Sequence, residues 1–207
     1  MYGRVTWYTG SPDRIEAGIQ GFKDSLPTVQ KLPGYLSAAL LVDRDGGEAM
    51  TIAYYRDQQA LADTRAMATQ IREGQQEQGI QVTKVEEYEI TTMERSQPGT
   101  TGHWGRVLTA TADPSRLDEA VAIVNENAVP IVKGLSGFRS YIGGVNRETG
   151  AAFTGLTFDT RDQLEASNAP AAGLREEVKR QAQLSDVKMQ VFEIVVADVA
   201  ATARATV

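Results

Sequence analysis

The chain of 207 residues is 42% hydrophobic and 23% charged, which is the composition of an ordinary soluble globular protein. A formal net charge of −6, with the basic residues spread thinly, argues against nucleic acid and an anionic membrane surface as partners. The lack of cysteine excludes disulfides and thiolate chemistry, and no apolar run approaches the roughly 20 residues that span a bilayer. Because the N-terminus also lacks the apolar core of a signal peptide, we expect a cytoplasmic protein.

The first half of the chain predicts a strand, a helix, two strands, a helix and a strand. Residues 3–9 alternate with the period of a strand. Ser11 with Pro12 then forms a helix start, because proline lacks only an amide that would be unpaired there, and Pro27 should kink or end this helix. Further elements are predicted as strands at 35–42 and 49–55, a helix from Asp57 to about Gly79, and a strand at 80–91.

The second half predicts the same order of elements. It follows a predicted linker at 93–103, which contains serine, proline and glycine. The predicted elements are a strand at 104–111, a helix capped by Asp113, strands at 137–145 and 151–158, a helix opened by Thr160, and a strand at 187–196. Pro170 and Gly173 should interrupt the last helix, and the tail at 198–207 is expected to fray.

An internal repeat runs through the chain. Gly3-Arg4-Val5 returns as Gly105-Arg106-Val107, Leu32-Pro33-Gly34-Tyr35 as Leu135-Ser136-Gly137-Phe138, and Glu89-Ile90 as Glu193-Ile194. The spacing between these pairs is nearly constant, so we predict two repeats, at 1–92 and 104–197.

Each repeat has the βαββαβ order of the ferredoxin-like motif, an antiparallel four-stranded sheet covered by helices on one face. The predicted central strands carry apolar residues on both faces, such as Leu40 and Leu41 in one and Val191 and Ile194 in another. Leaving the second sheet face in water would cost on the order of 10 kcal/mol, at roughly 25 cal/mol per Å² of apolar surface. We therefore expect an α+β fold in which two ferredoxin-like repeats pack sheet to sheet as a pseudo-dimeric α/β barrel.

On these features the chain resembles the dimeric α/β-barrel superfamily, most closely its antibiotic biosynthesis monooxygenase-like branch. The short first strand, the capped helix that ends in a kink, and the motifs at 32–35 and 135–138 carry the resemblance. Family members are usually homodimers of one unit, so the resemblance implies a tandem repeat with the dimer built into one chain. The activities it implies are cofactor-independent oxidation of polycyclic phenols, haem degradation and small-ligand binding. Haem degradation is not expected, because strand one has no asparagine and the second helix no histidine.

Polar aromatic residues concentrate in the first repeat. Trp7 and Tyr8 correspond to Thr109 and Ala110, Tyr54 and Tyr55 to Thr157 and Phe158, and Tyr88 to Phe192. An indole or a phenol can stack on a flat substrate while its polar end orients it. This predicts a pocket between the sheet and helices of residues 3–91, with Tyr54 catalytic and Trp7, Tyr8, Tyr55, Tyr88 and Trp104 binding the substrate. The alternative is that these aromatics only pack the sheet.

His103 is the single histidine and a candidate general base, or alternatively an exposed residue of the linker. Arg139 would mark an anion or carboxylate ligand if it were buried, whereas an exposed position at the sheet rim is the alternative. With one histidine and no cysteine, we expect neither a metal site nor a cofactor.

The expected function is that of a cofactor-independent, monooxygenase-like protein acting on a small aromatic substrate. The alternative is a non-enzymatic, small-ligand-binding or stress-response barrel, so the sequence leaves open whether the protein is an enzyme. The partner we expect is a small molecule, with homo-oligomers beyond the internal pair left open.

Overall fold

The computed structural model describes residues 1–77, 79–96 and 101–199, and its order of elements runs twice. The first run is β1 (Tyr2–Thr9), a 3-10 turn at Pro12–Arg14, α1 (Ile15–Val29), β2 (Tyr35–Asp43), β3 (Glu48–Tyr55), α2 (Gln58–Asp63), α3 (Arg65–Glu77) and β4 (Gln81–Arg95). The second is β5 (Trp104–Thr111), a 3-10 turn at Pro114–Arg116, α4 (Leu117–Asn127), α5 (Val129–Lys133), β6 (Phe138–Val145), β7 (Ala151–Phe158), α6 (Arg161–Ala166), α7 (Asn168–Gln181) and β8 (Ser185–Val199).

The structure differs from the expected elements where helices break and where strands end. The predicted second helix is divided at Thr64 and its counterpart at Ser167, whereas α7 continues through Pro170 and Gly173. Pro170 is tolerated because it lies in the first turn of α7, where its missing amide would have no helical partner. β4 continues to Arg95, into the predicted linker, and β8 continues to Val199, into the predicted tail. Residues 97–100 and 200–207 of these two predicted segments lie outside the described residues.

The chain divides into two compact units. Unit 1 comprises Met1–Glu87 together with the segment from Glu193 onward, and unit 2 comprises Tyr88–Phe192. Both boundaries fall inside the long strands β4 and β8, so each of these strands contributes to both units. The predicted repeat boundaries instead follow the chain, and they stay a prediction.

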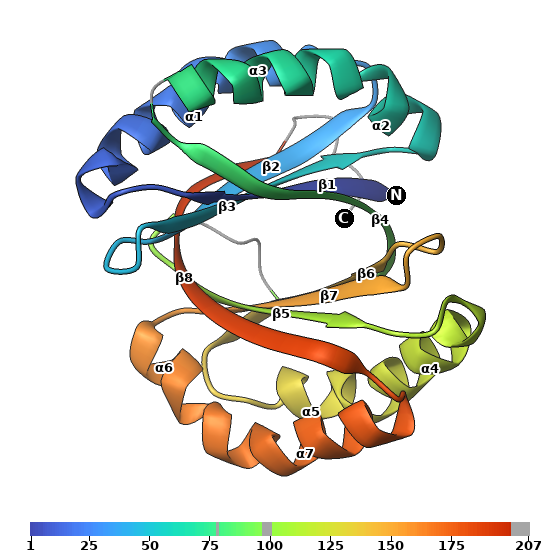
Figure 1. Ribbon diagram of the computed structural model, residues 1–207. Helices are drawn as coiled ribbons and strands as arrows, with labels where there is room; N and C mark the ends of the chain where they lie inside the picture. The colour runs from blue at the N-terminus through green and yellow to red at the C-terminus, as the bar shows by residue number, and fades with distance from the viewer. Residues whose placement is uncertain (78, 97–100, 200–207) are drawn as a thin grey trace. The chain divides into compact units, whose positions relative to one another are not determined.

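Each unit contains an antiparallel sheet with its helices on one face (Figure 1). In unit 1, β3 pairs with β1 and β2, and the end of β8 pairs with β2. In unit 2, β7 pairs with β5 and β6, and the end of β4 pairs with β6. The complete strand order, β1-β3-β2-β8-β5-β7-β6-β4, is that of a closed barrel. The α+β class and the ferredoxin-like order of elements are therefore confirmed. Among the described residues, no helix is both long and apolar enough to cross a membrane.

A glycine in each repeated motif positions the helix after β3 or β7. Gly34 and Gly137 have φ angles of 73° and 75°, in the left-handed region that side chains disfavour. A Cβ atom on Gly34 would lie 2.5 Å from Cβ of Ala60 in α2, and one on Gly137 would overlap Gln163 in α6. The repeated motifs thus reflect a close approach between the start of a strand and the helix that covers it.

Candidate functional site

A cavity of about 340 Å³ lies inside unit 2, between the helix-covered face of its sheet and helices α4 and α7. Small-molecule sites typically occupy 300–1,000 Å³, so the space fits one small ligand. The lining is mostly apolar, with Leu108, Ala110, Leu156, Val121, Val124 and Leu174 among its members. Val187 and Met189 of β8 also line it, at 39% and 46% exposure, so the cavity reaches solvent beside them.

The cavity exists because three bulky residues of the first repeat are replaced by smaller ones in the second. Tyr8, Phe22 and Leu26 line the corresponding space in unit 1, which measures only about 70 Å³. Their counterparts in unit 2 are Ala110, Val124 and Ala128, and all three line the larger cavity. The aromatic residues of the first repeat therefore fill space, and their loss in the second repeat opens it.

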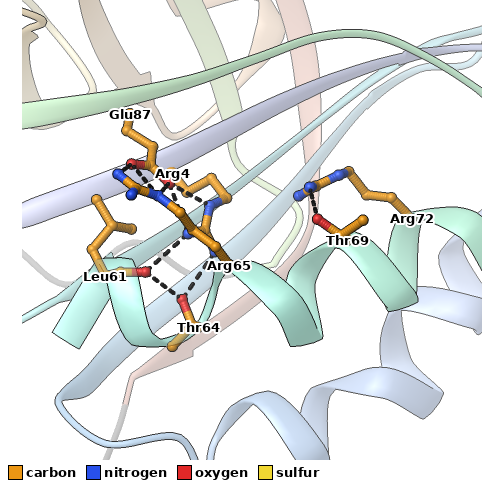
Figure 2. A network of polar contacts seen from close by, with 7 residues as sticks. All are labelled: Arg4, Leu61, Thr64, Arg65, Thr69, Arg72 and Glu87. Carbon is orange, nitrogen blue, oxygen red and sulfur yellow. Dashed lines mark hydrogen bonds and ion pairs between the residues drawn. The ribbon is translucent and has the colours of Figure 1, made fainter. Parts of the chain in front are cut away.

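In unit 1, the buried guanidinium of Arg4 is neutralised by a carboxylate (Figure 2). Arg4 is 5% exposed on β1, and its Nη1 and Nη2 donate to Thr64 Oγ1 and Leu61 O, each at 2.9 Å. Its Nε and Nη2 donate to Glu87 Oε1 at 3.1 and 2.8 Å, and Arg65 pairs with the same carboxylate at 2.6 Å. Burial acts to raise the pKa of Glu87, but the hydrogen bonds from Arg65 and Arg4 outweigh it and leave that pKa lowered.

In unit 2, the counterpart Arg106 has the same two neutral partners but no carboxylate. It is 2% exposed, and its guanidinium donates to Ser167 Oγ at 2.9 Å and to Leu164 O. Its Nε makes no hydrogen bond. The position of Glu87 is taken by Val191 at the spacing of the Glu89 and Glu193 motifs. Burial and the nearby charge of Arg175 lower the pKa of Arg106 to about 10. Arg106 and Arg175 both line the cavity.

Other polar groups of the cavity lie on β4, β6, β7 and α4. Tyr141 is 3% exposed, and burial raises the pKa of its hydroxyl above the ordinary value, against the opposing influence of Thr154. Thr92 Oγ1 bonds Asn125 Oδ1 at 2.7 Å. A mostly apolar space with a few polar groups and two arginines suits a flat or branched ligand with a polar end.

Comparisons with known proteins agree on the fold. No family model matches the chain. Two uncharacterized proteins of Mycobacterium tuberculosis are 27% and 24% identical over 198 and 199 residues, covering 95% of this chain and 88% and 84% of their own lengths. Among solved structures, an anthrone oxidase-like protein matches with a TM-score of 0.76 at 14% identity, over 98% of this chain and 94% of that one. A proposed monooxygenase of Fusobacterium nucleatum matches at 0.74 and 12%, over 96% and 94%.

A third solved structure links this fold to a named group. It is an uncharacterized ferredoxin-fold protein of Listeria monocytogenes related to antibiotic biosynthesis monooxygenases, with a TM-score of 0.55 at 8% identity, over 94% of this chain and 95% of that one. The chain shares its α/β-barrel fold with these three structures. At these identities the likeness defines the fold of this α/β-barrel protein, and its chemistry has to be argued from its own residues.

The aromatic residues that the sequence nominated lie elsewhere in this α/β-barrel protein. Tyr8 and Tyr55 line the cavity of about 70 Å³ in unit 1. Trp7 and Tyr54 are each 8% exposed, and Trp7 alternates with Arg4, Thr6 and Tyr8 along β1, so it points to the sheet face opposite the helices. Tyr88 is 1% exposed in unit 2, with its ring centroid 4.6 Å from that of Phe153.

His103 and Trp104 lie at the start of β5. The His103 side chain is 15% exposed, and its Nε2 lies 3.8 Å from Asp159 Oδ1, a carboxylate that also pairs with Arg139. Trp104 packs against the core of unit 2 and holds Arg161 over its ring at 5.1 Å. None of the seven nominated residues lines the cavity of unit 2, although all are described. The catalytic and binding roles assigned to them stay predictions.

Arg106 and Arg175 are the residues that sequence reasoning missed. The sequence contained a signal for Arg106, because an arginine occupies the same place in both Gly-Arg-Val triplets. In each strand this arginine lies on the face opposite to that of the following valine, Val5 or Val107. The second signal was the missing acid, since Val191 stands where the first repeat has Glu87. Only the structure shows that Arg4 and Arg106 are both buried and that Arg4 alone of these two has an acid beside it.

Proposed function

We propose that the protein binds a small, mostly apolar molecule in the cavity of unit 2. The observation that carries the proposal is the space itself, about 340 Å³ with a largely apolar lining, in the repeat whose side chains are smaller than their counterparts. Water in such a space makes few hydrogen bonds, so replacing it by an apolar ligand is favourable.

The test is binding of an apolar probe to the natural chain and to a variant whose cavity is filled. Ala110→Tyr with Val124→Phe restores the residues that occupy the same space in unit 1. We expect 2-naphthalenemethanol to bind the natural protein and to lose most of its affinity for the filled variant, measured by calorimetry. The matched control, Tyr8→Phe in unit 1, should bind like the natural protein. Equal binding to the natural and filled proteins would contradict the proposal.

A second candidate function is oxygenation of an aromatic ligand at this site without a cofactor. Support comes from the likeness in fold to an anthrone oxidase-like protein and from the buried Tyr141 hydroxyl on the cavity wall. With anthrone and dioxygen the balanced reaction yields the quinone and water: one oxygen atom becomes the new carbonyl, and the other leaves with the two hydrogens of the methylene carbon.

This second function is tested by following dioxygen uptake and quinone absorbance with anthrone, using boiled protein as the control. The filled variant should lose the activity if the cavity is the reaction site. His103→Ala and Tyr54→Phe test the predicted catalytic roles. Neither residue lines the cavity, so a reaction inside the cavity should continue in both variants. Binding without turnover would favour the non-enzymatic, ligand-binding alternative.

A further inference from the structure

The cavity of unit 2 contains two arginines whose charge no described carboxylate balances. Arg106 is 2% exposed, and its Nε has no hydrogen-bond partner. Arg175 is half-buried and donates to Asn168 O at 3.2 Å, and neither arginine forms an ion pair with any residue that the structure describes. The other charged residues of the lining are Glu176 and Lys179, which are exposed on α7 and carry opposite charges.

Unit 1 shows how the same arrangement is completed by an acid. Arg4 and Arg72 are the counterparts of Arg106 and Arg175, and both line the small cavity of unit 1. There, Glu87 accepts hydrogen bonds from Nε and Nη2 of Arg4. In unit 2 the guanidinium of Arg106 donates to Ser167 and Leu164, which are the counterparts of Thr64 and Leu61. The counterpart of the acid is absent. The unsatisfied edge of Arg106 is thus the edge that an acid occupies in unit 1.

The two cavities also differ in volume. Where the acid is present, the neighbouring space is about 70 Å³, and where it is absent the space is about 340 Å³. A buried cation without an acid is costly, so a chain that keeps both arginines and enlarges the space next to them leaves a place for an anion from outside. Because the walls of the cavity are mostly apolar, the remainder of the ligand should be apolar as well.

We infer that the ligand of this cavity is an aromatic monocarboxylate, whose carboxylate binds to Arg106 and Arg175 and whose ring lies against the apolar wall. The inference rests on the proposed ligand-binding function and adds the chemical class of the ligand. A carboxylate fits because arginine donates to its oxygens with charge-assisted hydrogen bonds, as Arg4 does to Glu87. A ring fits because Tyr141 borders the same space among apolar side chains such as Leu108 and Leu156.

The experiment compares two probes of similar shape, 2-naphthoate and neutral 2-naphthalenemethanol, by calorimetry at pH 7. The natural chain should bind the carboxylate roughly ten- to hundredfold more tightly than the alcohol, because hydrogen bonds to charged groups are the stronger ones. Arg175→Met should remove that preference and leave the affinity for the alcohol nearly unchanged. Arg72→Met is the matched control, since it removes the counterpart arginine in unit 1, and it should keep the preference.

A second variant guards against misfolding of an arginine mutant. Val191→Glu places an acid where unit 1 has Glu87, so this carboxylate should pair with Arg106 and weaken naphthoate binding while sparing the alcohol. If the alcohol binds and naphthoate is no tighter, the carboxylate inference is wrong while the proposed function stands. If neither probe binds, both fail. If Arg72→Met abolishes the preference as fully as Arg175→Met, the assignment to unit 2 is overturned.

Discussion

Removing the carboxylate of Glu87 tests the electrostatic account of the two repeats. The change Glu87→Ala leaves the buried guanidinium of Arg4 with Thr64 and Leu61 O as partners, and it takes away two hydrogen bonds, at 3.1 and 2.8 Å. It also removes an ion pair with Arg65, which contributes little because the Arg65 side chain is 61% exposed.

The magnitude follows from burial and from the second repeat. Breaking a buried ion pair costs about 3–5 kcal/mol when the remaining charge has no relief. The Glu87 side chain is 23% exposed, so water can replace part of the lost interaction, and Arg106 shows that the fold holds an arginine without an acid. We therefore expect the free energy of unfolding to fall by about 2–3 kcal/mol.

The assay is urea unfolding at pH 7, followed by circular dichroism, with Glu16→Ala as the control. Glu16 also pairs with an arginine, Arg44, but its side chain is 73% exposed, so its loss should change stability little. The double variant Arg4→Met/Glu87→Val should be more stable than Glu87→Ala, because it removes the stranded charge as well as its partner. If Glu87→Ala is as stable as Glu16→Ala, the reasoning about the buried arginine is wrong.

Three further predictions concern pH and packing. The pKa of Glu87 is lowered in the folded protein, so its contribution is present above the unfolded pKa of about 4.5 and is lost as pH falls through the folded value; the gap in stability between the natural chain and Glu87→Gln should therefore shrink below pH 4.5, and a gap independent of pH would refute this. Gly34→Ala should destabilise the protein by about 1–3 kcal/mol in urea unfolding, because of its positive φ and the approach of Ala60, whereas Gly74→Ala in α3 has open space and should not destabilise it. Tyr35→Phe removes a hydrogen bond of 2.7 Å to Asp198 and should cost about 1 kcal/mol, with an unchanged unfolding midpoint as the contrary result.

The sequence predicted the elements and the fold family well, because local rules govern both. Strand alternation in 3–9 and the Ser11-Pro12 helix start act over a few residues, and the structure places elements there. The helix breaks at Thr64 and Ser167 were missed, since each hydroxyl is held by a buried arginine from a distant strand.

The location of the candidate site could not be predicted in the same way. The abundance of aromatics in the first repeat suggested a pocket there, yet Tyr8 and Phe22 occupy the space that Ala110 and Val124 leave open in unit 2. A sequence records which side chains are present, but a cavity is the volume that packed side chains do not fill. The volume of a cavity is known only once the distances between the packed strands and helices are known.

The sequence by itself determined that this chain repeats one arrangement of strands and helices twice, and that an arginine opens both copies. The tertiary structure alone decided which repeat contains the larger cavity and which of the two arginines has an acid beside it. The reason is that pairing and packing depend on residues far apart in the chain. Arg4 donates hydrogen bonds to Thr64 and Glu87. Arg106 donates to Ser167, but Val191 stands at the position that corresponds to Glu87. Spacing along the sequence predicts folding of each segment, and only distances in space decide how charge and volume are balanced.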